Sequence, residues 1–298
     1  MKRRDFIQSA GLLPLLNFNG AKTISVPNIS TNRFKISLNA YSFNDYLTKH
    51  SLTLEELIIF CSENNFDAVD LTGYYFPNYP EVPTDEYIFH IKNLVHKNGL
   101  SISGTGIRNE FADPDESKRA KEILFIKQWI EVAAKLGAPV LRIFTGKKLP
   151  DNYQWKQVAD WMIQDIKVCV DHAKKHGVII GMQNHNDFIL TADQAIYFAE
   201  NLDKDWFGLI VDTGSFVKNN AYSEIEKAAS YAVNWQIKEL ITINGKIEAM
   251  DLNRLFKIIF NSTYKGYLPI ETLSKGDQKL IIPEFYKSVQ NAMIQARK

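Results

Sequence analysis

Apolar and polar positions follow two alternating patterns from residue 34 onward. Short runs of apolar, often β-branched residues are typical of buried strands. They cover residues 34–41, 66–72, 100–107, 139–145, 177–185, 206–213, 231–238 and 266–272. Between them, apolar residues recur at spacings of three and four, which predicts amphipathic helices. The helical segments cover residues 52–64, 84–99, 116–137, 154–177, 191–202, 221–230, 251–261 and 280–297.

The order of these segments predicts a single α/β domain over residues 33–298. Successive parallel strands need a crossover connection, which is usually a helix. Eight strand–helix units favour a (β/α)₈ TIM barrel. An open doubly wound sheet is the alternative, but no glycine-rich nucleotide fingerprint follows any strand. Ser51 or Thr53 is expected to cap the first helix, and Gly137 and Gly177 to end two others.

The first 30 residues are excluded from this fold. Arg3 and Arg4, followed by Phe6, Ile7 and a short apolar stretch, resemble a twin-arginine export signal. We therefore expect a leader at residues 1–30, a periplasmic barrel, and membrane association only through this signal. The alternative is an amphipathic helix of the mature protein.

The composition limits the classes of binding partner that can be expected. The 298 residues carry a formal net charge of +1, which gives no reason to expect nucleic acid. Cys61 and Cys169 fall on predicted helices and fit buried apolar positions better than a disulfide. His172 and His176, like the other histidines outside the strand ends, are expected at the surface. The oligomeric state is left open, a homo-oligomer included.

Polar residues end the last four predicted strands. Gln183 and His185 end the strand predicted at 177–185, and Asp212 lies at the end of the next one. Gln236 and Lys238 end the strand at 231–238, and Glu271 ends the last strand. In a parallel barrel these ends lie on one face, where active sites are built. The pattern predicts one shared mouth.

Two buried carboxylates that converge need a proton or a cation. A divalent ion is one solution, with Gln183, Asp212, Gln236 and Glu271 as its ligands. Such oxygen ligands favour Mn²⁺ or Mg²⁺ over Zn²⁺. The alternative is a structural ion network in which Asp212 and Glu271 pair with the cations at the same mouth, namely Arg142 and Lys238.

These strand ends resemble those of the xylose isomerase-like barrels, the sugar phosphate isomerase/epimerase superfamily. The runs QNH at 183–185, DTG at 212–214, QIKE at 236–239 and IET at 270–272 fall in the family's order. The resemblance, from about Phe34 to the end, implies a divalent metal bound at these four strand ends. Gln183 and Gln236 stand where the family has Glu and His, and Ser215 stands where a further His is usual.

Family isomerases are thought to move a proton next to a carbonyl between two metal-bound glutamates. Gln183 cannot carry a proton, so Glu271 is the predicted base. His185 and Lys238 become the candidates for the second proton carrier. The expected substrate contacts are Tyr41, Arg142, His185 and Lys238.

Three hypotheses follow. The leading one is an exported, metal-dependent sugar isomerase or epimerase that enolises a free sugar or keto-sugar derivative. The second is a lyase or hydratase acting on a 3-keto-type sugar. The third is a non-catalytic carbohydrate-binding barrel with a degraded metal site. A small carbohydrate is the expected partner in each.

Overall fold

The computed structural model describes residues 34–185 and 188–297. Eight of its strands form the barrel: β1 (Lys35–Asn39), β2 (Ala68–Thr72), β3 (Ser101–Gly106), β4 (Val140–Ile143), β5 (Ile179–Gln183), β6 (Phe207–Asp212), β7 (Ala232–Lys238) and β10 (Tyr267–Glu271). Its α-helices are α1 (Asn44–Thr48), α2 (Leu54–Glu63), α3 (Asp85–Lys97), α4 (Glu116–Leu136), α5 (Trp155–His176), α6 (Ala192–Asn201), α7 (Ala221–Ala228), α8 (Leu252–Asn261) and α9 (Gln278–Gln295).

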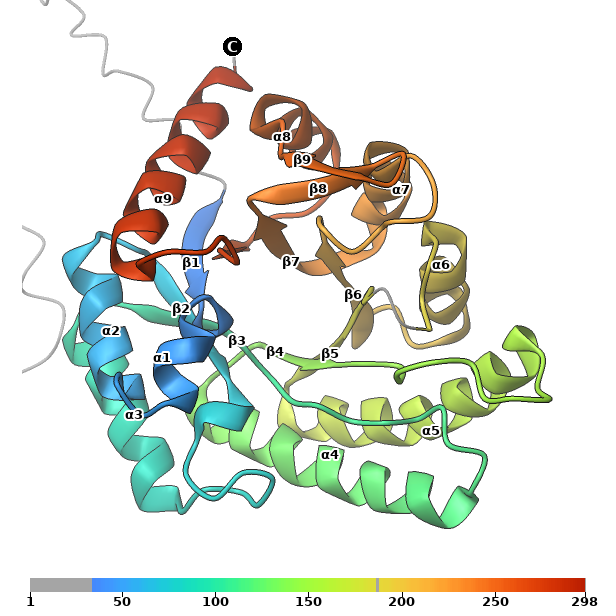
Figure 1. Cartoon of the computed structure of the whole chain (residues 1–298). Helices are drawn as coiled ribbons and strands as arrows, with labels where there is room; N and C mark the ends of the chain where they lie inside the picture. The colour runs from blue at the N-terminus through green and yellow to red at the C-terminus, as the bar shows by residue number, and fades with distance from the viewer. Residues whose placement is uncertain (1–33, 186–187, 298) are drawn as a thin grey trace, which may run out of the picture. The chain divides into compact units, whose positions relative to one another are not determined.

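The eight strands close into a parallel barrel inside a ring of helices (Figure 1). The strand order is β1-β10-β7-β6-β5-β4-β3-β2, and β1 pairs with both β10 and β2. The prediction of a (β/α)₈ barrel is therefore confirmed. The predicted leader at residues 1–30 lies outside the described residues, so export and a periplasmic location stay predictions.

The strands are buried on both faces, which explains their nearly continuous apolar runs. All residues of β2, β4 and β6 are buried. The helices begin and end at the predicted signals: Thr53 forms a capping box with Glu56, and Gly137 and Gly177 end α4 and α5 in the left-handed region. Cys61 and Cys169 are buried and free, as expected.

The strand predicted at residues 177–185 ends two residues earlier than expected. The run at 177–185 forms a strand only to Gln183, and the His185 N–H donates to the Gln183 carbonyl at 2.9 Å. The backbone therefore turns directly after Gln183. His185 reaches the mouth from this turn and not from a strand position. No described helix is long and apolar enough to cross a membrane.

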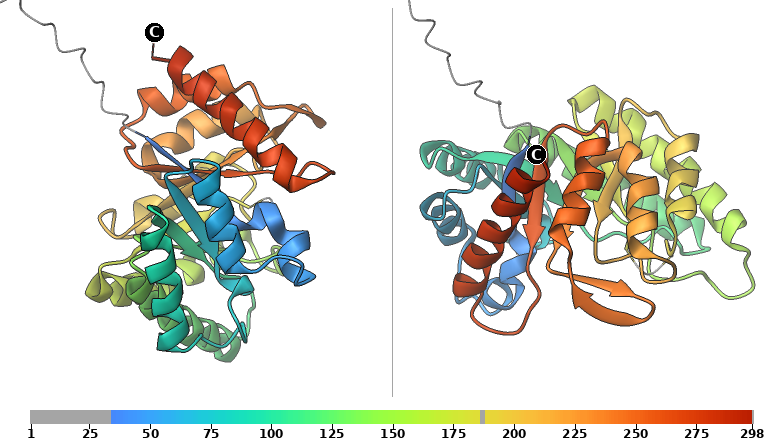
Figure 2. Two further views of the ribbon diagram at one scale, coloured as in Figure 1. Left: turned by 90° about the vertical axis from the view of Figure 1, so that its left-hand side faces the viewer. Right: turned by 90° about the horizontal axis from the view of Figure 1, so that it is seen from above.

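A hairpin between β7 and α8 was not anticipated from the sequence. Strands β8 (Leu240–Ile243) and β9 (Lys246–Ala249) pair antiparallel and project beyond the helices (Figure 2, right). Asn244 and Gly245 connect them, both with positive φ, 51° and 77°. An Asn-Gly pair with this geometry is the most favoured two-residue hairpin turn. A hydrogen bond from Met250 N to Glu239 O, at 2.8 Å, closes the base of the hairpin.

Close contact between β6 and β7 gives a prediction for stability. A Cβ added at Gly208 would lie 2.9 Å from the Tyr231 carbonyl and would also meet Val233. Gly208→Ala should therefore lower the free energy of unfolding by about 1–3 kcal/mol, as overpacking does. Urea unfolding measures this, with the exposed Ser230→Ala as control. Equal stability of the two variants would contradict the tight packing of this seam.

Candidate active site at the barrel mouth

A cavity of about 390 Å³ opens at the carboxyl ends of the strands. It is lined by six of the predicted site residues: Tyr41, Arg142, Gln183, His185, Lys238 and Glu271. Further lining residues are Tyr74, Arg108, Asn109, Phe144, Gly146, Lys147 and Leu273. The strand ends therefore converge on one space, as the sequence predicted.

Asp212 lies beneath this cavity and is fully buried. Its Oδ1 accepts a hydrogen bond from Gly214 N at 3.0 Å, and its Oδ2 accepts one from Gln183 Nε2 at 2.6 Å. Asn184 fixes the backbone of Asp212, since its Nδ2 donates to the Asp212 carbonyl and its Oδ1 accepts from the Asp212 N–H. Hydrogen bonds from uncharged groups therefore hold this carboxylate in place, in addition to any contact with a cation.

Lys238 lies between the two buried carboxylates. Its Nζ is 2.7 Å from Glu271 Oε1 and 3.3 Å from Asp212 Oδ2. The strand register explains the contact, because Lys238 is paired with Glu271 across β7 and β10, while Gln236 is paired with Asp212 across β6 and β7. Side chains two residues apart on a strand share a face, so both β7 residues point inward.

Burial and the neighbouring charges shift the pKa values of Lys238 and Glu271. Burial by itself lowers the pKa of Lys238, but Asp212 and Glu271 together raise it above its ordinary value. Burial raises the pKa of Glu271, and Lys238 opposes this rise. Lys238 is therefore an ammonium at neutral pH, and Glu271 is a carboxyl group whose affinity for a proton is increased.

Arg142 supplies a second buried cation. Its Nη1 donates to Gln183 Oε1 at 3.1 Å, and its Nη2 donates to the Tyr74 hydroxyl at 3.0 Å. The guanidinium also lies 4.4 Å from the Phe144 ring centroid, a cation–π contact. These contacts fix the Gln183 amide, because its oxygen accepts from Arg142 while its nitrogen donates to Asp212.

Gln236 lies deeper and contacts a different group. Its Oε1 accepts from Asn39 Nδ2 at 3.4 Å, and the same Nδ2 donates to Asp70 Oδ1 at 3.2 Å. Burial raises the pKa of Asp70 to about 6, with Arg142 opposing the rise. Asp70 thus adds a third carboxyl group beneath the mouth.

The predicted metal ligands do not fit a divalent ion in this arrangement. Asp212 already accepts from Gly214 and Gln183, and Lys238 lies between it and Glu271. Gln183 turns its amide nitrogen, which cannot bind a metal, toward Asp212. A divalent ion would have to displace the ammonium. Among the described residues both carboxylates pair with Lys238, as in the ion network that the sequence left as an alternative, whereas Arg142 is connected only to Asp212 and only through Gln183.

The model of the family described as xylose isomerase-like TIM barrel matches residues 58–289, most of the chain. The chain belongs to this family. No curated protein matches it in sequence. Membership agrees with the barrel and with a site at the strand ends.

Similar solved structures share the fold at low identity. The 3-keto-D-glucoside 4-epimerase of E. coli is 15% identical with a TM-score of 0.69, over 87% of this chain and 99% of that chain. An L-ribulose 3-epimerase is 15% identical with a TM-score of 0.71, over 88% and 95%. The probable 3-DHS dehydratase of Bacillus anthracis is 13% identical with a TM-score of 0.68, over 86% and 99%. The fold thus occurs in epimerases and in a probable dehydratase.

The hairpin residues were missed by the sequence analysis. Leu240, Ile241, Thr242 and Ile247 line a second space of about 300 Å³ that shares His185, Lys238 and Glu271 with the main cavity. The signal that could have revealed the hairpin is the Asn244–Gly245 pair between alternating apolar residues.

The bridging ammonium gives a prediction about metal binding. Wild-type protein should bind no Mn²⁺ at the mouth, whereas Lys238→Ala leaves two carboxylates without their cation and should bind one Mn²⁺. Electron paramagnetic resonance during Mn²⁺ titration measures both. Lys147→Ala, which also removes a cavity-lining lysine, is the matched control and should resemble wild type.

A second substitution keeps this test decisive if Lys238→Ala is unstable. Lys238→Gln keeps the length of the side chain without its charge and should also gain Mn²⁺ binding. Stoichiometric Mn²⁺ binding by wild type that is lost in Asp212→Asn would contradict the assignment and restore the predicted metal centre.

Proposed function

We propose that this protein is a sugar isomerase or epimerase that removes a proton next to the carbonyl of a keto sugar. One observation carries the proposal: Glu271 faces the cavity with one oxygen 2.7 Å from Lys238 Nζ. Among the described residues, Lys238 is the only hydrogen-bond donor to the Glu271 carboxylate, so its other oxygen accepts no hydrogen bond. A buried carboxylate with one restrained and one available oxygen is suited to act as a base.

Burial favours the chemistry at Glu271. Burial raises the pKa of the Glu271 carboxyl group, and a carboxylate with a raised pKa is a stronger base toward a C–H bond beside a carbonyl. In the proposed step, the C–H bond beside the carbonyl breaks and the proton moves to Glu271. The bonding electron pair moves toward the carbonyl oxygen, which becomes an enolate oxygen.

Lys238 and Arg142 would stabilise that oxygen. An ammonium has three N–H donors, and Lys238 directs two toward Asp212 and Glu271, which leaves one for the substrate. Arg142 lines the same cavity and adds a fixed positive charge. Preorganised cations in a water-poor site stabilise developing negative charge without further rearrangement.

The proton must return to carbon for isomerisation or epimerisation. His185 lines the cavity from the turn after β5, while Glu271 approaches from β10. Its ring packs against Phe144, with ring centroids 5.3 Å apart. We assign His185 as the second proton carrier, because an imidazole exchanges protons near neutral pH.

A lyase or dehydratase acting on a keto sugar is the second candidate. The observation that favours it is Gln183, an amide locked between Arg142 and Asp212 where a second carboxylate base would stand. β-Elimination needs one base and one acid that protonates the departing hydroxyl, and Glu271 and His185 suffice. The occurrence of this fold in a dehydratase supports the same reaction class.

Aromatic residues at the rim support a carbohydrate as substrate. Tyr41 and Tyr74 are arranged edge to face with ring centroids 6.3 Å apart, and both line the cavity. Phe144 lines another wall. Apolar ring faces can cover the C–H surface of a sugar while the buried polar groups bind its oxygens.

One isotope experiment tests the proposal and separates the two reactions. The protein is incubated in D₂O with a panel of 3-keto and 2-keto sugars, and proton NMR follows the carbon beside the carbonyl. An epimerase should incorporate one deuterium and form an epimer, whereas a dehydratase should form an alkene signal. Glu271→Gln should lower either rate about 10²–10⁴-fold, because the amide accepts no proton.

The outcome that contradicts catalysis is also defined. Binding of a keto sugar without exchange, epimer or alkene would indicate the non-catalytic carbohydrate-binding barrel. Lys147→Gln, which alters the cavity wall but none of the assigned groups, is the control and should retain the wild-type exchange rate. Full activity of a folded Glu271→Gln variant would remove Glu271 from the base role.

The pKa of Glu271 predicts the acid limb of the pH profile. Glu271 must be deprotonated to act, so kcat/KM should fall as pH decreases through its raised pKa, at a pH above the ordinary carboxyl value of 4.5. Lys238 lowers this pKa, so Lys238→Gln should move the acid limb to higher pH. Initial rates across the pH range measure the shift. An unmoved limb would mean that another group controls it.

A further inference from the structure

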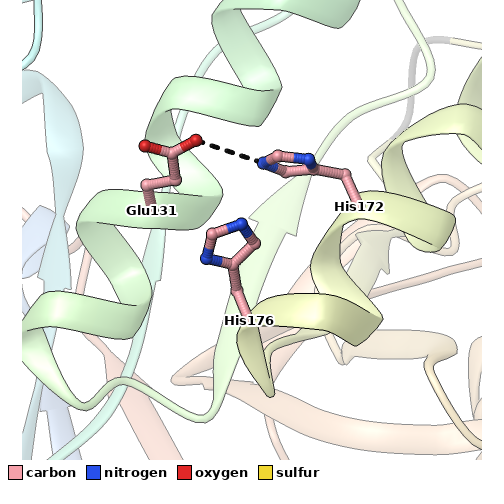
Figure 3. A group of neighbouring side chains, drawn as sticks. All are labelled: Glu131, His172 and His176. Carbon is pink, nitrogen blue, oxygen red and sulfur yellow. Dashed lines mark ion pairs between the residues drawn. The ribbon is translucent and has the colours of Figure 1, made fainter.

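A cluster of three potential metal ligands lies on the outer helices (Figure 3). Glu131 comes from α4, while His172 and His176 come from α5, one helical turn apart. Residues four apart on a helix share a face, so both imidazoles project toward α4. None of these residues lines the cavity at the mouth.

The three side chains are already near coordinating distance. His172 Nε2 is 3.3 Å from Glu131 Oε1, and the two imidazole centroids are 4.5 Å apart. One ligand atom from each residue lies within 4.8 Å of the other two. Tetrahedral coordination with bonds of about 2.0–2.1 Å places ligand atoms roughly 3.3 Å apart, so only small side-chain rotations are needed.

The surroundings of His172 Nε2 support the same site. Its Nε2 is buried and has no hydrogen-bond partner among the described residues, although it faces the Glu131 carboxylate at ion-pair distance. An imidazole nitrogen that has no hydrogen bond and lies beside a carboxylate is in position to bind a metal ion together with that carboxylate.

We propose that Glu131, His172 and His176 bind one divalent transition-metal ion of the Zn²⁺ class and thereby fasten α4 to α5. Two imidazole nitrogens favour Zn²⁺ over the oxygen-preferring Mg²⁺ and Ca²⁺. Three protein ligands leave a fourth position for water, in keeping with the exposure of Glu131 and His176. The ion stabilises the barrel wall and takes no part in the proposed reaction.

Zinc titration tests this site on the full chain. Isothermal titration calorimetry should show one equivalent of Zn²⁺ bound by wild type, with affinity at least tenfold weaker in His172→Ala and in Glu131→Gln. His90→Ala is the matched control, because His90 pairs with Glu55 at 3.6 Å in an analogous His–carboxylate contact. Its Zn²⁺ affinity should equal that of wild type.

Two further measurements make the result unambiguous. Co²⁺ should give the visible spectrum of a tetrahedral site in wild type and in Glu271→Gln, but not in His172→Ala. Zn²⁺ should raise the thermal unfolding midpoint of wild type by a few degrees, whereas with EDTA wild type and His172→Ala should unfold alike. Equal Zn²⁺ affinity of wild type and His172→Ala, or loss of the Co²⁺ spectrum in Glu271→Gln, would overturn the proposal.

Discussion

The buried ammonium of Lys238 is the interaction on which the candidate active site depends. Two carboxylates brought out of water at the same end of a barrel repel each other and lose hydration. Lys238 contacts both, at 2.7 Å and 3.3 Å, and its positive charge offsets the repulsion between Asp212 and Glu271. Removing one member of such a group leaves an uncompensated buried charge, which is far more costly than the net stability that the intact group provides.

The barrel makes this arrangement possible through strand register. Asp212, Lys238 and Glu271 end three adjacent strands, and a slip by one residue in β7 would turn Lys238 toward the helices. Arg142, from β4, extends the network through Gln183 without touching either carboxylate. Arg142, Lys238 and Glu271 also line the cavity, so stability and the proposed chemistry depend on the same charged residues.

Much of this architecture could be predicted from the sequence. Eight apolar runs and the helical spacing between them specified the barrel, and the polar residues after those runs specified its mouth. The strand-end motif did not specify whether Asp212 and Glu271 bind a metal or Lys238, because that depends on side-chain direction and on the reach of a flexible lysine. The orientation of the Gln183 amide could not be predicted either, because the sequence does not determine whether its oxygen or its nitrogen faces Asp212.

Contacts between distant segments account for what the sequence analysis missed. The spacing of His172 and His176 is visible in the sequence, but Glu131 joins them only because α4 packs beside α5. Asn184 precedes Asp212 by 28 residues, and its exchange of two hydrogen bonds with that backbone follows from the pairing of β5 with β6. The hairpin, in contrast, carried a local signal at Asn244 and Gly245.

The hairpin of β8 and β9 lines a space beside the cavity but is not part of the barrel sheet. It begins directly after Lys238, is closed at Glu239 and Met250, and exposes Ile247, whose accessible fraction is 72%. Its tip makes no contribution to the strand pairing of the barrel. Changes in its length or sequence can therefore reshape the space beside the cavity while Lys238 and Glu271 stay in place, so the outer wall and the charged floor can vary independently in evolution.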